Sequence, residues 1–291
     1  AACPGYAYTP DADAPAVAAL RAAGAVVIGK TNLDQFATGL VGTRSPYGAV
    51  RDARRPDRIS GGSSSGSAVA VAIGAADLGI GTDTAGSGRV PAAYQGLVGI
   101  KGTIGLVSTA GVVPACPSYD CVTILARDLA TAESAMAVMA STTQRPWPTS
   151  TRFAAAAVAI LAVPTELPAM APGWDAAFQR AVDAARDAGM RIVPIDLTDF
   201  LAAARLLYEG ALVAERTEAV GDFIAAAGAD AGLDPTVAAI IAAGGAHTAT
   251  GLLRDRRELD RLRERAFRAL GECDALLVSG GHTEILKINS F

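Results

Sequence analysis

Apolar and polar positions along the chain follow two periods, which predict helices and short strands in alternation. Helical spacing is expected over 11–23, 65–74, 129–140, 174–188, 199–227 and 251–270. Short apolar runs predict strands over 25–28, 78–81, 158–163, 191–195 and 275–278. Because a helix followed by a strand is the building unit of α/β folds, the pattern indicates a mostly parallel or mixed sheet with helices on its faces.

The composition is that of an ordinary globular chain with enough apolar residues for a large core. Of 291 residues, 51% are hydrophobic and 19% are charged, and the net charge is −4. A weakly acidic chain has no electrostatic attraction to nucleic acid or to an anionic membrane surface. No apolar run is long and pure enough to span a bilayer. A small-molecule substrate is therefore the expected partner.

The four cysteines lack the C-x-x-C spacing of zinc sites and redox motifs: Cys3, Cys116, Cys121 and Cys273. A disulfide framework or a metal site is therefore disfavoured, and we expect reduced thiols in a cytoplasmic protein. No motif in the chain requires a metal or an organic cofactor, so we expect none.

Residues 60–99 form the most informative stretch of the chain, SGGSSSGSAVAVAIGAADLGIGTDTAGSGRVPAAYQGLVG. Two serine–glycine clusters, around Ser63 and around Ser87, flank a compact apolar run. Small residues let backbone N–H groups approach a reacting atom, and such donors stabilise a developing oxyanion. A flexible linker is disfavoured, because residues 68–73 and 78–80 are apolar and core-forming. The pattern favours a serine hydroxyl held among amide donors.

Two phosphate-binding motifs fit this stretch poorly. The segment GTDTAGS over 81–87 has the glycine spacing of a P-loop, but Ser87 stands where the lysine belongs. The tripeptide over 79–81 begins a dinucleotide fingerprint, but Thr84 stands where its third glycine belongs. The P-loop interpretation lacks its phosphate-binding lysine, and the dinucleotide interpretation lacks its third glycine.

A nucleophile elbow is a minor alternative. Residues 62–66 match its G-x-S-x-G pattern, and His282 lies downstream in the order that α/β-hydrolases use. An elbow directly follows a buried strand, whereas the charged segment over 51–58 precedes this one. The elbow is therefore disfavoured.

The same stretch resembles the signature of the amidase family: a GGSSSGS turn, an apolar helix and strand, then G-T-D-x-x-G-S-x-R-x-P-A. The resemblance implies that Ser87 is the nucleophile and that Ser63, on a cis peptide bond, relays a proton to a lysine base. It implies an oxyanion hole made of the backbone N–H groups of Thr84, Ala85, Gly86 and Ser87. We expect Asp83 and Arg89 to brace the loop rather than to react.

The base of this mechanism is absent from the expected place. A serine needs a base, and neither His247 nor His282 lies near the glycine-rich core in sequence. In the family the catalytic lysine belongs to a V-x-K-D-N segment upstream of a stretch like residues 1–10. The three lysines here lie in other segments: Lys30, Lys101 and Lys287. We expect either an N-terminal truncation or a protein that cannot catalyse as it stands.

The flanking segments are most similar to allophanate hydrolases. They include TGLVGTRSPYG over 38–48, STAGVVPAC over 108–116 and LLYEGALVAER over 206–216. The resemblance implies that Tyr208 and Arg216 hold the substrate, Tyr208 by its hydroxyl and Arg216 by gripping the carboxylate of allophanate. Their spacing of eight residues predicts that both lie on one face of a single helix, two turns apart.

The resemblance implies a single amidase domain over 1–291, an α/β/α sandwich around a large mixed sheet. We expect it to be incomplete at the N-terminus, to have an atypical tail over 279–291 and to lack a separate C-terminal domain. The implied activity is hydrolysis of allophanate to ammonia and carbon dioxide through a serine acyl-enzyme. Functional coupling to a urea carboxylase, in urea degradation, and a homodimer are compatible with it. Two alternatives stay open: a fragment or paralogue without the base, and a broad-specificity amidase of small amides.

Overall fold

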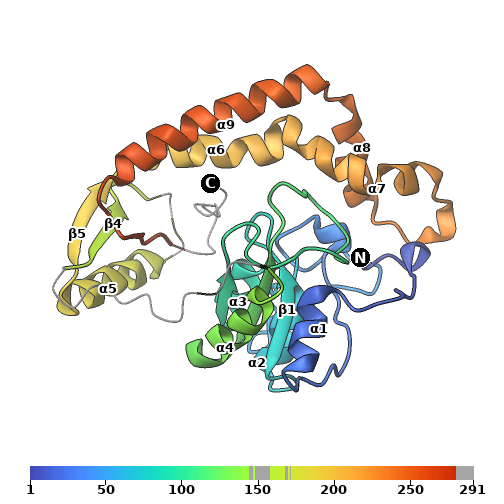
Figure 1. The fold of residues 1–291 in the computed structure, drawn as a ribbon, viewed down its shortest axis with the longest axis horizontal. Coiled ribbons are helices and arrows are strands. Elements are labelled where there is room, and N and C mark those ends of the chain that lie inside the picture. Colours follow the sequence, from blue (N-terminus) through green and yellow to red (C-terminus); the bar gives the residue numbers. More distant parts are fainter. Residues whose placement is uncertain (144–146, 148–157, 168–169, 171, 280–291) are drawn as a thin grey trace. The chain divides into compact units, whose positions relative to one another are not determined.

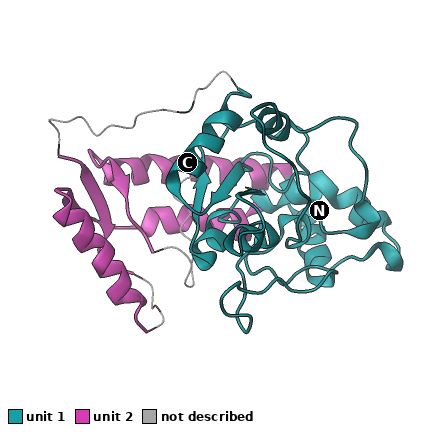
Figure 2. Ribbon diagram, turned by 90° about the horizontal axis from the view of Figure 1, so that it is seen from below, with its two compact units in different colours: residues 1–149, 212–248, 290 teal, residues 150–211, 249–289, 291 magenta. Residues whose placement is uncertain are grey.

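The computed structural model describes residues 1–143, 147, 158–167, 170 and 172–279. They contain both α-helices and β-strands, so the predicted α/β class is confirmed (Figure 1). The chain divides into two compact units (Figure 2). The first lies within residues 1–149 and 212–248, and the second within 150–211 and 249–289.

The first unit is built on a three-stranded antiparallel sheet of order β1-β3-β2. Its strands are β1 (Leu78–Thr82), β2 (Val98–Lys101) and β3 (Val122–Ala126). Its α-helices are α1 (Pro15–Ala22), α2 (Ser65–Ala72), α3 (Arg89–Gln95), α4 (Leu129–Ala140), α7 (Ala214–Ala226) and α8 (Pro235–Ala243). Every residue of the central strand β3 is buried, because neighbouring strands cover its edges and helices cover its faces.

The two faces of β3 pack against different helices. Val122, Ile124 and Ala126 contact the buried residues of α1 and α4. Leu125 points to the opposite face and packs with Ala68 of α2 and with a residue of α3. Because successive side chains of a strand alternate between faces, this arrangement makes three layers of helix, sheet and helix. The layers fix the ends of β1, α2 and α3, where both serine clusters lie.

The second unit has a parallel sheet of order β5-β4-β6. Its strands are β4 (Ile160–Pro164), β5 (Arg191–Ile195) and β6 (Ala275–Leu276), and its α-helices are α5 (Trp174–Asp187), α6 (Thr198–Glu209) and α9 (Ala249–Leu270). Its core joins Ala162 of β4 to Phe200 of α6 and Ala266 of α9. Among the described residues no single helix is both long and apolar enough to cross a membrane. One bent pair, 235–246 with α9, meets that test by length and composition only.

Most predicted elements are confirmed within a few residues of their expected ends, and α4 matches its prediction at both ends. The strands β2 and β3 were not predicted. The described strands form two three-stranded sheets instead of one large mixed sheet. Most of the tail over 279–291 lies outside the described residues, and so do His282 and Lys287 within it.

The predicted strand over 25–28 is wrong. Val26, Val27 and Ile28 belong to no helix or strand and are exposed by 83%, 59% and 70%. A strand needs a neighbour to take up its backbone hydrogen bonds. No described segment pairs with this one, so the apolar pattern alone does not make it a strand.

The predicted single helix over 199–227 is interrupted. Helix α6 ends before Gly210, whose backbone is extended (φ −98°, ψ −177°). The N–H of Ala211 donates to Asp255 Oδ2 at 2.6 Å instead of continuing the helical pattern. A short 3₁₀ turn over Ala211–Val213 then leads into α7. A carboxylate from another helix therefore stabilises a break that the apolar periodicity of the sequence does not reveal.

Candidate active site

The second serine cluster forms the turn between β1 and α3. Ser87 lies two residues before the first residue of α3, and it is buried. Gly86 has a φ of +113°, a conformation that side-chain-bearing residues rarely adopt. The turn connects the half-buried end of β1 directly to the N-terminus of α3.

Asp83 organises this turn. Its carboxylate accepts hydrogen bonds from the backbone N–H groups of Gly86 (2.6 Å), Gly88 (3.3 Å) and Arg89 (3.1 Å). The guanidinium of Arg89 adds two more, at 2.9 and 3.0 Å. Burial alone would raise the pKa of Asp83, but hydrogen bonds and charge from Arg89 and the bonds from backbone N–H groups hold this pKa below its usual value. The predicted bracing role of Asp83 and Arg89 agrees with these contacts.

Three backbone donors of the turn are unused. The N–H groups of Thr84, Ala85 and Ser87 have no acceptor within the described part of the chain. The fourth predicted oxyanion donor, Gly86, differs, because its N–H is committed to Asp83. The oxyanion hole of four N–H groups stays a prediction; in this structure three of them are unused and the fourth donates to Asp83.

The first serine cluster contains the cis peptide bond that the resemblance implies, between Gly62 and Ser63. Ser63 is fully buried, and its Oγ has no hydrogen-bond partner among the described residues. Its carbonyl oxygen accepts the N–H groups of Asp34 (3.1 Å) and Ser65 (2.8 Å). The backbone of Ser63 is thus held firmly, while its hydroxyl is left for another group.

The two clusters meet in the structure. The N–H of Ser64 donates to the carbonyl oxygen of Ser87 at 3.1 Å. The Ser64 hydroxyl lies 3.2 Å from both the backbone nitrogen and the carbonyl oxygen of Thr82, at the end of β1. No hydrogen bond joins Ser63 Oγ to Ser87 Oγ in this state. Catalytic hydrogen bonds often tighten only when substrate binds, so adjacency of the two turns is the informative observation.

Sequence reasoning missed Asp34, which positions the first cluster. Its buried carboxylate accepts the N–H groups of Val41 (3.3 Å), Gly42 (3.0 Å) and Arg44 (2.9 Å). A Cβ on Gly62 would lie 2.2 Å from Asp34 Oδ2, so only glycine fits there. A lone acid among turn-forming residues, as in NLDQFATG, was the available signal.

The nucleophile-elbow alternative is not supported. No strand precedes residues 62–66 among the described residues; the nearest pairing is an isolated bridge between Arg51 and Ile59. Ser64, the serine of that pattern, lies at the start of α2 and bonds to the backbone of Thr82.

The described residues supply no base for Ser63. Lys30 is exposed, and Lys101 is buried at the end of β2, with Nζ 3.4 Å from the Gly102 carbonyl oxygen and in contact with the Cys121 thiol. His247 is exposed beyond α8. None of them bonds to the hydroxyl of Ser63. The described residues also hold no group of three or more His, Cys, Asp or Glu side chains suited to a metal ion.

Tyr208 and Arg216 do not share a helix face, so that prediction is wrong. The break at Gly210 places Tyr208 on α6 in the second unit and Arg216 on α7 in the first. Tyr208 is 48% exposed. Spacing predicts a common face only when the helix between the two residues is continuous.

Arg216 is buried, with 8% of its surface exposed. Its Nη1 donates to Thr38 Oγ1 at 3.0 Å and lies 3.5 Å from the Ala37 carbonyl oxygen. Both partners are neutral, and no ion pair to Arg216 exists within the described part of the chain. Buried arginines are usually paired with an anion. The side chain is therefore suited to an anionic ligand.

The neighbouring Glu215 has a different role. Its Oε2 accepts the N–H of Ser118 at 2.9 Å and lies 3.4 Å from the Cys116 thiol. Burial and the negative charge of Glu215 raise the pKa of Cys116, so this thiol stays protonated. Cys116 is a packing and hydrogen-bonding residue, not a thiolate nucleophile.

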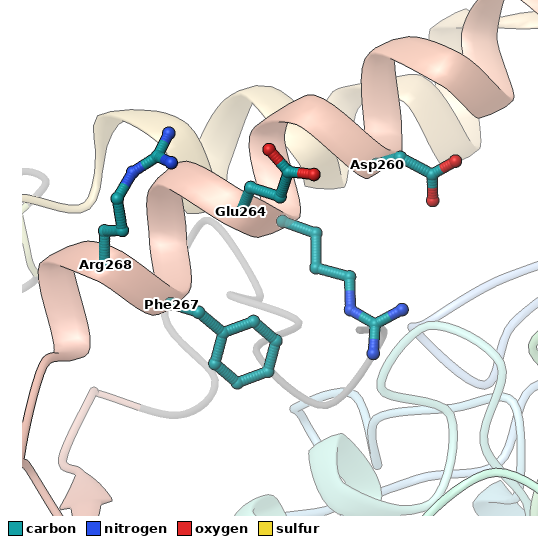
Figure 3. A pocket seen from close by; sticks show the side chains of 5 residues that line it. Asp260, Glu264, Phe267 and Arg268 are labelled. Carbon is teal, nitrogen blue, oxygen red and sulfur yellow. The ribbon is translucent and has the colours of Figure 1, made fainter.

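A separate pocket lies along α9, far in sequence from the serine clusters. Its described lining side chains all come from this one helix: Asp260, Arg263, Glu264, Phe267 and Arg268 (Figure 3). The guanidinium of Arg263 lies over the ring of Phe267, 5.7 Å from its centroid. These five residues are exposed and carry charges of both signs, so they form a solvated helix face.

Comparison with known proteins identifies the family. A sequence profile described as Amidase matches residues 2–291. The chain belongs to the amidase family. A urea amidolyase from Lachancea kluyveri is 45% identical over 285 residues, which are 96% of this chain and 16% of that protein. A urea amidolyase from Saccharomyces cerevisiae is 41% identical over 285 residues, again 96% of this chain and 16% of that protein.

Solved structures confirm the amidase fold. The structure of a serine-to-alanine variant of Kluyveromyces lactis allophanate hydrolase matches with a TM-score of 0.89 and 43% identity. The match covers 95% of this chain and 46% of that one. The chain thus spans less than half of that hydrolase and a small part of the urea amidolyases. The similarity to allophanate hydrolase inferred from the sequence is confirmed.

Proposed function

We propose that this amidase-family chain carries out the hydrolysis of allophanate through an acyl-enzyme on Ser87. The observation that supports it most is the turn over 83–88, where a buried serine is surrounded by three unused backbone N–H groups. Buried donors without acceptors are rare in folded proteins, because an unmade hydrogen bond is costly. Donors arranged in this way are what a tetrahedral oxyanion requires.

In the proposed reaction, Ser87 Oγ attacks the amide carbonyl carbon of the substrate. The carbonyl oxygen becomes an oxyanion and accepts hydrogen bonds from the N–H groups of Thr84, Ala85 and Ser87. The proton taken from Ser87 is transferred to the leaving nitrogen, so ammonia departs as the carbonyl re-forms and an acyl-enzyme remains on Ser87. Water then attacks this acyl group and releases an unstable carbamate-type product, which loses carbon dioxide.

The proton of Ser87 is proposed to pass through Ser63. The adjacent clusters, the cis bond at Ser63 and its buried, unpartnered hydroxyl support this relay. A neutral lysine, its pKa lowered by burial, would accept the proton; the family resemblance places it in a V-x-K-D-N segment. The unpartnered hydroxyl is also the observation that favours the alternative, a chain that folds and binds small carboxylates without turnover.

Arg216 supports allophanate over neutral amides. Allophanate carries a carboxylate, and a guanidinium binds a carboxylate through two parallel hydrogen bonds. Arg216 is buried with only neutral partners among the described residues, so a carboxylate ligand would complete its charge balance. The names of the relatives, urea amidolyase and allophanate hydrolase, support the same substrate.

The decisive experiment measures ammonia release from allophanate by the longest natural polypeptide that contains these 291 residues. Ser87→Ala is expected to abolish turnover, by roughly a thousandfold or more, and to prevent formation of a covalent adduct. Ser63→Ala is expected to slow turnover strongly while leaving Ser87 in place. Ser134→Ala, at an exposed hydroxyl on α4, is the matched control and should keep full activity. Retention of most activity by Ser87→Ala would contradict the proposal.

Substrate choice separates the remaining alternatives. We expect a clear preference for allophanate over malonamide and simple carboxamides in kcat/KM. Equal rates on all of them would favour the broad-specificity amidase. Binding of allophanate without turnover, in the longest natural polypeptide that contains these 291 residues, would favour the fragment or paralogue without the base. A cytoplasmic location, coupling to a urea carboxylase and a homodimer remain proposals that follow from the family resemblance.

A further inference from the structure

A buried acid, Asp120, stands between the candidate oxyanion turn and a second loop of the first unit. Only 6% of its surface is exposed. One carboxylate oxygen, Oδ1, accepts the hydroxyl of Thr84 at 2.5 Å. The other, Oδ2, accepts the N–H of Ala115 at 2.8 Å, and the N–H of Cys116 lies 3.1 Å from both oxygens. Every one of these contacts is made inside the first unit.

Asp120 makes the next contact between the two chain segments beyond the last paired residues of β1 and β3. Strands β1 and β3 are paired as far as Thr82 and Val122. The N–H of Asp83 then donates to the carbonyl oxygen of Cys121 at 2.8 Å. One residue further, the backbone ladder has ended, and the Asp120 carboxylate binds the Thr84 side chain instead. Thr84, whose N–H is the first unused donor of the turn, is thus held by the hydrogen bond from its hydroxyl to Asp120.

On the other side, Asp120 holds the loop that approaches α7. The loop over 115–120 turns back on itself, with the N–H groups of Tyr119 and Asp120 donating to the Cys116 carbonyl oxygen at 2.8 and 2.9 Å. Glu215 of α7 accepts the N–H of Ser118. Arg216 follows Glu215 directly on the same helix. A continuous set of hydrogen bonds therefore joins the turn that holds the reacting serine to the helix that carries the candidate carboxylate-binding arginine.

We propose that Asp120 is a positioning residue, which fixes the Thr84 N–H in the geometry needed for the oxyanion and ties it to the Glu215–Arg216 end of α7. This inference rests on the proposed function and deepens it. Asp83 shapes the turn from within, through N–H groups at 86, 88 and 89. Thr84, by contrast, is held from outside the turn by Asp120. Misplacement of a catalytic donor by about 1 Å slows reactions by up to about a hundredfold.

If Asp120 had a purely structural role, its substitution would change the amount of folded protein but not the rate per active molecule. Asp52 is a suitable comparison, because it is also a buried acid that accepts backbone N–H groups, those of Arg54 and Arg55, and is bonded by Gln95. It makes no contact with the oxyanion turn. If Asp120 served only to hold a loop, Asp120→Asn and Asp52→Asn would both reduce the fraction of folded protein and leave the rate per active molecule unchanged.

The test uses the longest natural polypeptide that contains this chain and two readouts. The first is the rate at which a fluorophosphonate labels Ser87, followed by intact mass, with Ser87→Ala as the blank; the end point counts active molecules. The second is kcat and KM on allophanate. Thr84→Val, which removes only the hydroxyl, is expected to lower both the labelling rate and kcat by about tenfold to a hundredfold, with KM within about twofold.

Three further variants sharpen this test. Thr84→Ser should recover most of the rate lost in Thr84→Val, because it restores the hydroxyl. Asp120→Asn should lose a similar factor, because its amide has one acceptor oxygen for the Thr84 hydroxyl and the two loop N–H groups. Combining it with Thr84→Val should add little, since both weaken the same interaction. Asp52→Asn should label at the wild-type rate per active molecule. If Asp120→Asn fails to fold, the Thr84 pair decides the outcome alone.

Each outcome is informative. Wild-type labelling rates in Thr84→Val, or losses that multiply in the double variant, would overturn the role of Asp120. Labelling of Ser87 without hydrolysis of allophanate would refute the proposed substrate, while the labelling comparison still tests Asp120. Absence of labelling in the wild-type protein would overturn both proposals together.

Discussion

The turn over 83–88 and the segment over 206–216 both carry residues predicted to act on substrate, and the structure builds them in different ways. In the turn, Asp83 accepts hydrogen bonds from N–H groups no more than six residues away, so contacts within the motif itself fix its geometry. In the segment, Gly210 ends α6, and Tyr208 and Arg216 belong to different units. A pattern held together by its own contacts can be interpreted from sequence, whereas a spacing is informative only if the element it assumes is continuous.

The buried charges of the two regions differ in the same way. Asp83 has its own cation, Arg89, and the structure balances its charge. Arg216 has only neutral partners among the described residues. The Asp83–Arg89 pair of the turn therefore stabilises the fold, and the charge of Arg216 in the segment is available to a ligand. Four substitutions and one pH experiment test this contrast, in order of decreasing effect.

Removing the cation of the turn should have the largest effect. Arg89→Met leaves the carboxylate of Asp83 buried without its partner, so the free energy of unfolding should fall by about 3 kcal/mol or more. Urea unfolding monitored by circular dichroism measures this change. Arg186→Met, which breaks an exposed pair with Asp183 on α5, is the control and should change the free energy by less than about 1 kcal/mol. Similar losses in both variants would remove the contrast between a buried and an exposed pair.

The same pair predicts a pH dependence. The pKa of Asp83 is lowered in the folded state, so its ionised form stabilises the fold above the unfolded value of about 3.9. This stabilisation is lost as the pH falls through the lower folded pKa. The difference in unfolding free energy between wild type and Asp83→Asn should therefore be full at pH 7 and shrink below about pH 4. A difference that stays constant from neutral to strongly acidic pH would contradict the assignment.

Replacing the guanidinium of Arg216, in the segment over 206–216, should affect catalysis rather than stability. Arg216→Lys keeps the charge but loses the fork of donors, so kcat/KM on allophanate should fall about ten- to a hundredfold, or roughly 1.5–3 kcal/mol. Neutral amides such as malonamide should be affected far less. Steady-state assays on both substrates measure the difference. Equal losses on both would show that Arg216 is structural.

Disturbing the break between the two helices should have a moderate effect. A Cβ on Gly210 would lie 2.6 Å from the Leu206 carbonyl oxygen and 2.7 Å from Asp255 Oδ2. Gly210→Ala should therefore lower the free energy of unfolding by about 1–2 kcal/mol. Gly228→Ala is the control: its Cβ would meet nothing within 4 Å and its φ is −76°, so we expect no loss of stability. Urea unfolding of the pair decides whether the break is specified at Gly210.

Removing the hydroxyl of Tyr208, the more exposed of the two residues proposed to bind substrate, should have the smallest effect. Tyr208→Phe should raise KM for allophanate only severalfold, because a single neutral hydrogen bond contributes about 0.5–1.5 kcal/mol. The ratio of this loss to that of Arg216→Lys ranks the two residues. A larger effect of Tyr208→Phe would reverse the ranking and place the main substrate contact on α6.

Much of the candidate site could be predicted from residues 60–99. The cis bond at Ser63, the bracing pair Asp83–Arg89 and the helix after each cluster are all present. Asp34 and Asp120 could not be predicted, because each acts on backbone groups or side chains that other parts of the chain bring to it. The use of the Gly86 N–H by Asp83 was missed for a related reason: it depends on the φ of one glycine.

The sequence by itself determined the family, the α/β class, most helix positions and the two serine turns, because short-range spacing and small residues specify these features locally. Only the tertiary structure decided that residues 25–28 remain without a strand partner, that Gly210 divides one predicted helix, and that β3 buries both faces. It also decided which buried charge is balanced: Arg89 balances Asp83, whereas Arg216 has only neutral hydrogen-bond partners among the described residues. Strand pairing, helix ends and charge balance depend on groups distant in the chain, and only folding brings those groups together.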